Sequence, residues 1–208
     1  MKLSTRKRLV LLAVILVVID QAIKLAVKTN MSLYDHFSVF GNWFQIFFIE
    51  NEGMAFGMKF GGAVGKFLLS AFRIVLCGAL VWWISSLCRR KASADAGASG
   101  ESRVPVGVLV GLTLITAGAF GNIIDCLFYG IIWDYAPFMF GKVVDMFYFP
   151  IINTVWPSWI PFIGGTPFTF FDPVFNFADS CVTVGAIYLL LFQWRFFSSS
   201  DTEAKKSK

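Results

Sequence analysis

Four apolar stretches dominate this sequence, and each approaches the roughly 20 residues that a helix needs to cross about 30 Å of hydrocarbon. They cover residues 9–27, 67–87, 104–128 and 176–197. Only 15% of the 208 residues are charged, whereas an ordinary soluble domain has about 25%. A soluble enzyme, a disordered chain and a disulfide-stapled secreted module are therefore disfavoured. We expect an all-α polytopic membrane protein with four transmembrane helices, forming a single membrane-embedded domain over residues 1–208.

The basic residues indicate how these helices are oriented, because lysine and arginine gather at cytoplasmic helix ends. Of the 18 cations, 12 fall on one side of the four-helix arrangement, where there are 4 of the 13 acids. That side therefore has a net charge of +8, and the rest of the chain has −3. The 12 cations are Lys2, Arg6, Lys7, Arg8, Arg89, Arg90, Lys91, Arg103, Arg195, Lys205, Lys206 and Lys208. We expect both termini and the tail 198–208 in the cytoplasm, and the connections 28–66 and 129–175 outside.

The first apolar stretch could instead belong to a cleavable signal peptide, since basic residues precede it. No small-x-small cleavage site follows it; Asp20-Gln21 comes next, and apolar residues continue to Val27. This pattern favours a retained first helix.

Histidine and cysteine provide little catalytic chemistry here. His36 is the single histidine, which argues against a histidine-based triad or a multi-histidine metal site. The four cysteines lie in or beside apolar stretches without C-x-x-C spacing, so we interpret them as small buried hydrophobic residues. They are Cys77, Cys88, Cys126 and Cys181. We expect no metal and no cofactor.

Four aspartates lie within the apolar stretches or just outside them: Asp20, Asp125, Asp145 and Asp179. A charge at membrane depth costs at least about 2.5–3.5 kcal/mol, so such residues are functional candidates. The alternative is a polar contact between helices, worth only about 0.6 kcal/mol. Asp20 and Lys24 are four residues apart and share one helix face, so they form either a neutralising pair or a substrate contact.

An Asn-x-x-Asp spacing occurs twice, as Asn122/Asp125 and Asn176/Asp179. With the orientation above, Asp125, Asp145 and Asp179 all come to the outer surface. Two adjacent carboxylates cannot both ionise easily, so they share a proton and can act as acid and base on a peptide carbonyl. The residues alone leave three possibilities open: an aspartyl protease, a proton-coupled transporter and a non-catalytic scaffold.

Five short motifs, taken in order, resemble lipoprotein signal peptidase (signal peptidase II). Any one of them is weak, but the five follow the family's order on a matching four-span layout and cover most of the chain. They are Asp20-Gln21-Ala22-Ile23-Lys24, Asn51-Glu52-Gly53-Met54-Ala55-Phe56, Gly121-Asn122-Ile123-Ile124-Asp125, Val143-Val144-Asp145 and Phe175-Asn176-Phe177-Ala178-Asp179-Ser180.

The resemblance implies an aspartyl endopeptidase of the bacterial cytoplasmic (inner) membrane that needs no metal. It would remove signal peptides from prolipoproteins by cleaving before a cysteine that carries diacylglycerol. Asp145 and Asp179 would be the catalytic pair. A globomycin-type inhibitor would occupy the site, membrane lipid would surround it, and no nucleic acid would be involved. Supporting and substrate-positioning roles would fall to Asp20, Lys24, Asn51, Gly53, Asn122, Asp125 and Asn176.

The resemblance also implies a small extracytoplasmic β-cradle after the first helix. Residues 40–50 are aromatic and β-branched enough for a strand, and the turn-prone Asn51-Glu52-Gly53 follows.

Two features depart from the family pattern. Cys126 stands where the family usually has arginine, and a thiol cannot replace a fork of five donors; Lys142 is a candidate for supplying the missing cation. The segment between the third and fourth stretches is also longer than usual and rich in aromatic residues. We interpret it as an interfacial aromatic belt, with an enlarged lid as the alternative. The added length leaves Asp134 and Asp172 as alternatives to Asp145.

Overall fold

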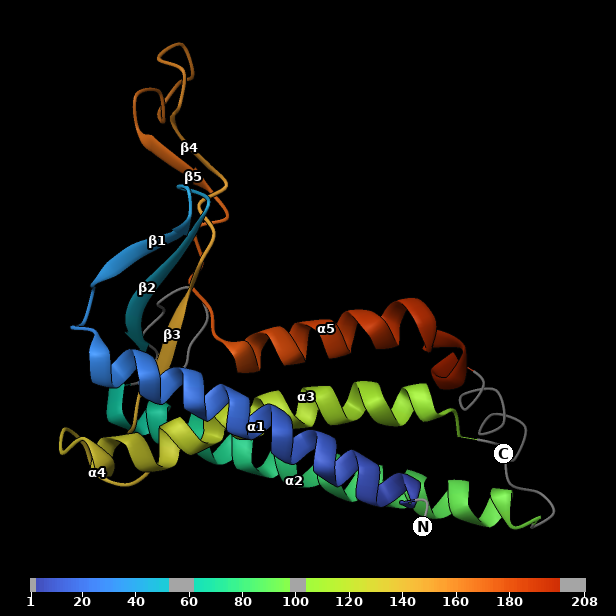
Figure 1. Cartoon of the computed structure of the whole chain (residues 1–208). Coiled ribbons are helices and arrows are strands. Elements are labelled where there is room, and N and C mark those ends of the chain that lie inside the picture. Colours follow the sequence, from blue (N-terminus) through green and yellow to red (C-terminus); the bar gives the residue numbers. More distant parts are fainter. Residues whose placement is uncertain (1–2, 53–61, 98–103, 199–208) are drawn as a thin grey trace.

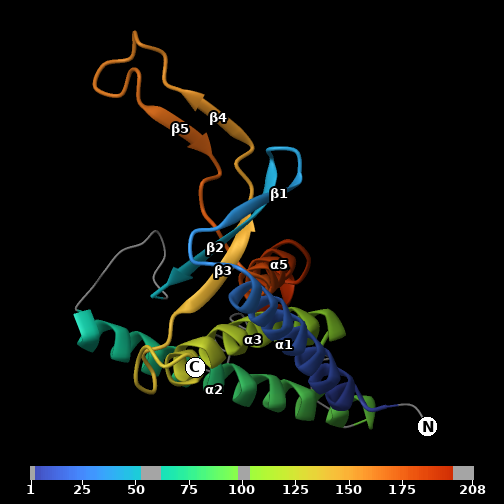
Figure 2. The same cartoon turned by 60° about the vertical axis from the view of Figure 1, so that its left-hand side comes forward.

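The computed structural model describes residues 3–52, 62–97 and 104–198. Helices form at all four predicted stretches: α1 Thr5–Asn30, α2 Gly62–Asp95, α3 Val106–Ile124 and α5 Phe177–Phe192. After α3 the chain stays helical through a wider π turn, η2 Asp125–Tyr129, and the short α4 Gly130–Ile132. The main helices run alongside one another (Figures 1 and 2).

Within the described residues, three helical segments are long and apolar enough to cross a membrane: Thr5–Asn30, Gly62–Asp95 and Val106–Ile132. α5 is apolar but has only 16 residues, about 24 Å at 1.5 Å per residue. The chain bends at Gln193 before a last helical turn. The predicted fourth stretch, 176–197, therefore does not form one continuous helix.

Large apolar side chains cover much of the outward surface of the helices. Val14, Phe72, Val75 and Leu190 are among those left exposed. In a soluble protein such a surface would promote aggregation, whereas in a bilayer it faces lipid tails. A buried cluster between the helices joins α1, α2, α3 and α5 through Leu9, Leu87, Val104, Val108, Leu109, Leu112 and Leu189.

Glycines allow α3 and α5 to pack closely. A Cβ at Gly111 would lie 2.6 Å from Leu189 Cδ2, and one at Gly118 would lie 2.3 Å from the carbonyl oxygen of Ala178. A larger residue at Gly118 would meet backbone and push the two helices apart, whereas one at Gly111 would displace the Leu189 side chain. The Gly107-x-x-x-Gly111 pattern thus serves helix packing, as small residues do in membrane helices.

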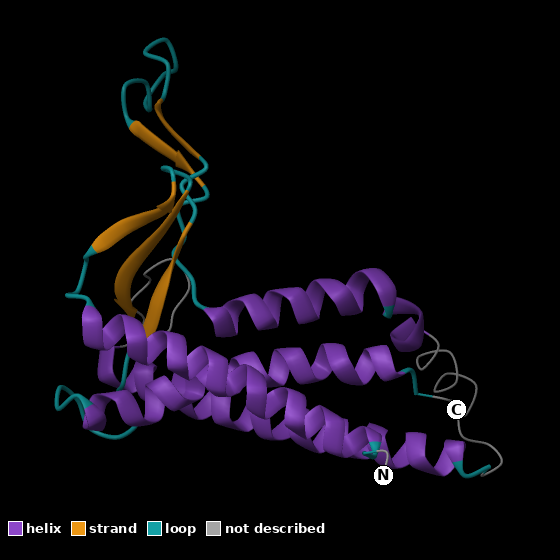
Figure 3. Cartoon of the chain, viewed as in Figure 1, coloured by secondary structure: helices purple, strands orange, loops and turns teal. Residues whose placement is uncertain are grey.

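A three-stranded antiparallel sheet lies at one end of the helices (Figure 3). Its order is β1-β2-β3, with β1 His36–Phe40, β2 Phe44–Asn51 and β3 Val143–Tyr148. The prediction of a strand over residues 40–50 is confirmed for residues 44–50, which belong to β2, whereas a turn with Gly41 at φ +50° separates them from the end of β1 at Phe40. β3 comes from the second outer segment and places Asp145 opposite Ile49. Phe48, Val144 and Met146 pack with Val27 and Tyr129 to fix the sheet on the helices.

The rest of the long outer segment forms a second hairpin, with β4 Ile152–Val155 paired to β5 Pro167–Phe170. We call residues 149–171 the aromatic arm. It extends from the sheet across the direction of the helices and away from them (Figures 1 and 2). The arm contains no Asp, Glu, Lys or Arg. At its tip, Trp159 is 79% exposed and Phe162 fully exposed.

An uncharged arm with exposed aromatic residues should lie in the interface of the outer leaflet, where tryptophan is enriched. We predict that Trp159 contacts lipid. The test compares the fluorescence of the unaltered protein with that of Trp159→Phe in vesicles. The difference between the two is the emission of Trp159. This emission should be quenched by a lipid that carries a nitroxide near its headgroup, and it should not be quenched by iodide in the water. Free quenching by iodide, or protection from both quenchers, would rule out the interfacial arm.

Candidate active site

Lys24 lies at the centre of a buried charge cluster. Its Nζ is 2.9 Å from Asp20 Oδ2, one turn earlier on α1, and 2.7 Å from Asp125 Oδ2 at the end of α3. Lys24 and Asp125 are completely buried and Asp20 is 2% exposed. Burying one ammonium and two carboxylates is costly unless their remaining hydrogen-bonding positions are satisfied. The neutralising pair expected from the sequence is therefore present, and it includes a third charge.

Neighbouring donors satisfy the carboxylate oxygens of this cluster. Gln21 Nε2 donates to Asp125 Oδ1 at 2.9 Å and to Asp20 Oδ2 at 3.1 Å. The backbone N–H of Ala178 donates to Asp20 Oδ1 at 2.9 Å. Tyr129 in turn donates to Gln21 Oε1 at 3.2 Å. α1, α3 and α5 are thus joined through one polar cluster. Gly121 makes this possible, because a Cβ there would lie 2.6 Å from Asp20 Oδ2.

The same lysine sets the orientation of Asn122. Lys24 Nζ donates to Asn122 Oδ1 at 2.8 Å. An ammonium can only donate, so the amide oxygen must face Lys24 and the amide NH2 group faces away. That NH2 group donates to Asp179 Oδ1 at 2.8 Å. The Asn-x-x-Asp spacing therefore lets Asp125 hold the lysine while Asn122, one turn earlier, contacts a different aspartate.

Asn176 connects Asp179 with Asp145. Its Nδ2 donates to Asp145 Oδ1 at 2.6 Å and to Asn122 Oδ1 at 3.1 Å. Asn176 is also the N-cap of α5: its Oδ1 accepts from the Asp179 N–H at 2.9 Å, and Asp179 Oδ2 accepts from the Asn176 N–H at 3.3 Å. This reciprocal pair is a capping box. The second Asn-x-x-Asp spacing is thus a helix start that holds an aspartate at the site.

Asp145 lies in β3 and is 2% exposed. Asn51, from the neighbouring strand β2, donates from Nδ2 to Asp145 Oδ2 at 3.3 Å. Burial first, and then the negative charge of Asp179, raise the pKa of Asp145 to about 7. A pKa near 7 leaves Asp145 protonated over part of the neutral range, next to the negative charge of Asp179. Such a pair can act as acid and base at once.

The two alternative aspartates lie elsewhere. Asp134 is exposed, in a turn where its φ is +52°. Asp172 is also exposed and accepts a hydrogen bond from Tyr148 at 3.2 Å. Neither is among the hydrogen-bond partners of Asn176. Gly53, another predicted site residue, lies outside the described residues.

The sequence motifs gave no indication of Arg73. This residue lies beside Cys126, the position where the family usually has arginine. Arg73, on α2, donates from Nη1 to Cys126 Sγ at 3.2 Å. Lys142, the cation proposed from the sequence, instead lies 3.4 Å from Glu50 Oε2. No short motif could have indicated Arg73, because Arg73 and Cys126 are 53 positions apart in the sequence.

A π turn begins at Asp125, where the π helix η2 starts. The nearby loop supplies donors for two of its carbonyls: the Gly141 N–H donates to the Cys126 carbonyl at 2.9 Å and the Met139 N–H to that of Leu127 at 3.3 Å. A Cβ at Gly141 would lie 2.1 Å from the Asp125 carbonyl oxygen. Such turns are frequent at functional sites.

The chain is similar to known proteins over most of its length. A family model described as signal peptidase (SPase) II matches residues 12–195. A lipoprotein signal peptidase of Porphyromonas gingivalis strain W83 is 44% identical over 205 residues, covering 91% of this chain and 84% of the relative. One from Amoebophilus asiaticus is 35% identical, covering 86% and 75% of the two chains. A solved bacterial membrane enzyme has a TM-score of 0.61 at 25% identity, over 93% of this chain and 91% of that one.

Removing the buried ammonium should destabilise the protein strongly. Lys24→Met leaves two buried carboxylates without their cation, and breaking a buried ion pair from one side costs about 3–5 kcal/mol. Lys7→Met makes the same chemical change on the exposed start of α1 and is the matched control. Thermal unfolding in detergent should show a clear loss of Tm for Lys24→Met alone. Equal Tm values for the two variants would contradict a structural role for Lys24.

Proposed function

This chain belongs to the signal peptidase II family, and we propose that it cleaves prolipoproteins with Asp145 and Asp179 as its catalytic pair. The protein is a membrane peptidase that removes signal peptides from prolipoproteins, the activity for which its relatives are named. The observation that carries the assignment of the pair is the bridge through Asn176, which hydrogen bonds to Asp145 and caps the helix that starts beside Asp179.

The proposed reaction uses one proton shared by the two carboxyl groups. The ionised carboxylate removes a proton from water, and the resulting nucleophile attacks the scissile carbonyl while the other carboxyl group protonates its oxygen. When the tetrahedral intermediate collapses, the first carboxyl group returns its proton to the leaving amine, and the second carboxylate takes back a proton from the hydroxyl group that becomes the carbonyl. Asn122 and Asn176 hold the two acids in position throughout.

The reaction centre lies where the sheet meets the helices, which suits a substrate that is itself in the membrane. β3 brings Asp145 from the sheet, and α5 brings Asp179 from its first turn. The proposed substrate carries diacylglycerol on the cysteine after the cleavage site. Its lipid would stay in the outer leaflet while the peptide reaches the acids. A globomycin-type inhibitor would compete for the same position.

The proposed topology has four spans, with both termini on the cytoplasmic face of the inner membrane. The separation of charges supports it, because the basic start of α1 and the basic end of α2 lie at the end of the bundle away from the sheet (Figure 1). α5 with its continuation to Ser198 would form the short fourth span. The transporter alternative has no support in the family match.

The assignment is tested by cleavage of a diacylglyceryl-modified prolipoprotein by the purified, reconstituted protein. Asp145→Asn and Asp179→Asn should each lower kcat by at least about 100-fold, because each removes an acid–base partner. Asp134→Asn and Asp172→Asn make the same change at exposed positions and should leave kcat unchanged. Near-normal turnover by either of the first two variants would refute the pair. Proton flux without any cleavage by the unaltered protein would favour the transporter.

The raised pKa of Asp145 predicts the pH at which kcat begins to fall on the alkaline side. Since burial and Asp179 raise this pKa to about 7, the shared proton is lost as the pH rises above 7, and kcat should fall there. Asn51 stabilises the ionised form of Asp145 by donating to it, so Asn51→Ala should raise the pKa and shift the fall in kcat to higher pH. A fall that stays in place, or moves to lower pH, would contradict this account.

A further inference from the structure

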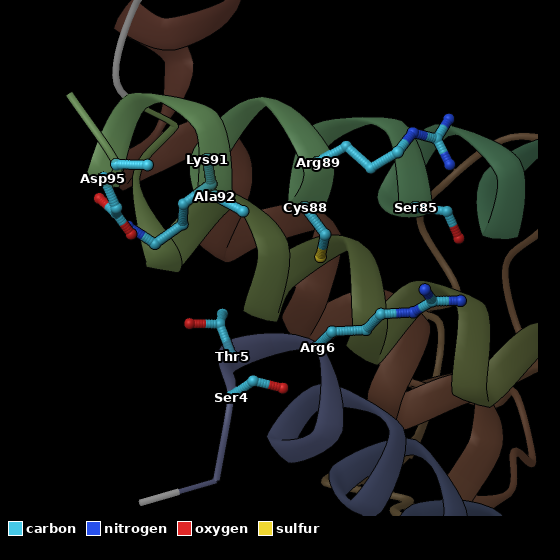
Figure 4. A pocket seen from close by; sticks show the side chains of 10 residues that line it. Ser4, Thr5, Arg6, Ser85, Cys88, Arg89, Lys91, Ala92 and Asp95 are labelled. Atoms are coloured by element: carbon cyan, nitrogen blue, oxygen red, sulfur yellow. The ribbon is translucent and has the colours of Figure 1, made fainter. Parts of the chain in front are cut away.

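A pocket lined by several charged residues lies at the opposite end of the protein from the acids. It is a pocket of about 590 Å³ between the start of α1 and the end of α2 (Figure 4). Arg6 of α1 and Arg89 and Lys91 of α2 line it, together with Asp95. Nothing in the proposed cleavage reaction uses these residues.

The pocket has more positive than negative charge. Lys91 Nζ is 3.2 Å from Asp95 Oδ2, so these two charges pair with each other. Among the described residues, no ion pair involves Arg6 or Arg89. In Figure 4 both guanidinium groups extend toward the same side of the pocket. This leaves two cations that can face an anion.

The start of α1 adds neutral donors to the same pocket. The hydroxyl groups of Ser4 and Thr5 border it. Ser4 is the N-cap of α1 and accepts from the Lys7 N–H at 3.4 Å. Helix N-termini attract anions through their unpaired N–H groups and the helix dipole. The start of α1 thus gives the pocket a polar border, while the guanidinium groups of Arg6 and Arg89 extend away from it (Figure 4).

An apolar groove of about 190 Å³ continues from this pocket into the bundle. The two hollows share Arg6, Ser85 and Cys88, so they adjoin. Beyond these residues the groove is lined by apolar side chains, including Leu9 and Ala13 of α1 and Val81 and Ile84 of α2.

Two threonines of α3 also line the groove, but their hydroxyl groups are already used. Thr113 donates to the Leu109 carbonyl at 2.7 Å and Thr116 to the Leu112 carbonyl at 2.8 Å. The groove therefore offers no free hydroxyl donor from these residues, and it suits a hydrocarbon chain.

We propose that this pocket and groove together bind one anionic phospholipid of the cytoplasmic leaflet. The phosphate would lie beside the guanidinium groups of Arg6 and Arg89, and one acyl chain would follow Leu9 and Ala13 along the groove. Basic pockets between membrane helices on the cytoplasmic side commonly bind anionic headgroups. A free phosphate would contact only the cations, whereas a ligand with a hydrocarbon chain would also fill the adjoining groove. The site lies far from the acids, so its occupancy does not depend on the cleavage reaction.

Native mass spectrometry of the full chain in detergent tests the proposal. Phosphatidylglycerol should bind at least about tenfold more tightly than phosphatidylcholine with the same chains, because the latter headgroup has no net charge. Glycerol phosphate, which supplies the headgroup without chains, should not displace the bound lipid at equal concentration. Equal binding of the two lipids, or full displacement by glycerol phosphate, would overturn the proposal.

Variants locate the binding. Arg6→Gln and Arg89→Gln should each weaken phosphatidylglycerol binding about tenfold, since each removes a charge-assisted hydrogen bond. Arg8→Gln removes the same charge from α1 at an exposed position outside the pocket and is the matched control. Ala13→Phe should fill the groove and weaken lipid binding, while Asp145→Asn should leave it unchanged. If Arg8→Gln is as harmful as Arg6→Gln, net charge rather than this pocket explains the binding.

Discussion

The structure depends on one buried ammonium group. Lys24 contacts Asp20, Asp125 and Asn122 within 2.9 Å and has no exposed surface. Two carboxylates offset the free-energy cost of burying this lysine. The lysine and the neighbouring hydrogen-bond donors in turn offset the cost of burying the carboxylates. Asp20 lies on α1, Asn122 on α3 and Asp125 at the start of η2, so the cluster fixes how far α1 is shifted along α3. It also explains why glycine stands at position 121, where any Cβ would displace Asp20.

This cluster reaches the proposed catalytic pair through two amides. Lys24 fixes which side of Asn122 can donate, Asn122 donates to Asp179, and Asn176 joins Asn122 to Asp145. The helices therefore hold Asp179 in place, and strand β3 of the sheet brings Asp145 to it. The pKa of Asp145 is raised because its strand is buried against the helices and Asp179 is near. A buried polar network of this kind holds geometry only if every member has its partners.

Much of this arrangement can be predicted from local pattern, and the rest depends on distant contacts. The apolar stretches predict four helices, and Asn176-x-x-Asp179 can be recognised as a helix start. The pairing of Asp20 with Lys24 follows from helix periodicity. By contrast, β3 pairs with β2 across more than 90 residues, and Arg73 meets Cys126 from another helix. No short motif encodes either contact. The strand expected over residues 40–50 begins only at Phe44, because the backbone turns at Gly41 and Phe40 ends the preceding strand.

We propose that Asp145 and Asp179 share one proton near neutral pH. Infrared difference spectroscopy of the unaltered protein against Asp145→Asn measures this directly, since a protonated carboxyl group has its own carbonyl stretching band. A protonated-carboxyl band that depends on Asp145 should persist well above the usual aspartate range and disappear as the pH rises through about 7. A band that is lost near pH 4, the ordinary aspartate value, would show that Asp145 titrates as an isolated carboxyl group and would contradict the shared proton.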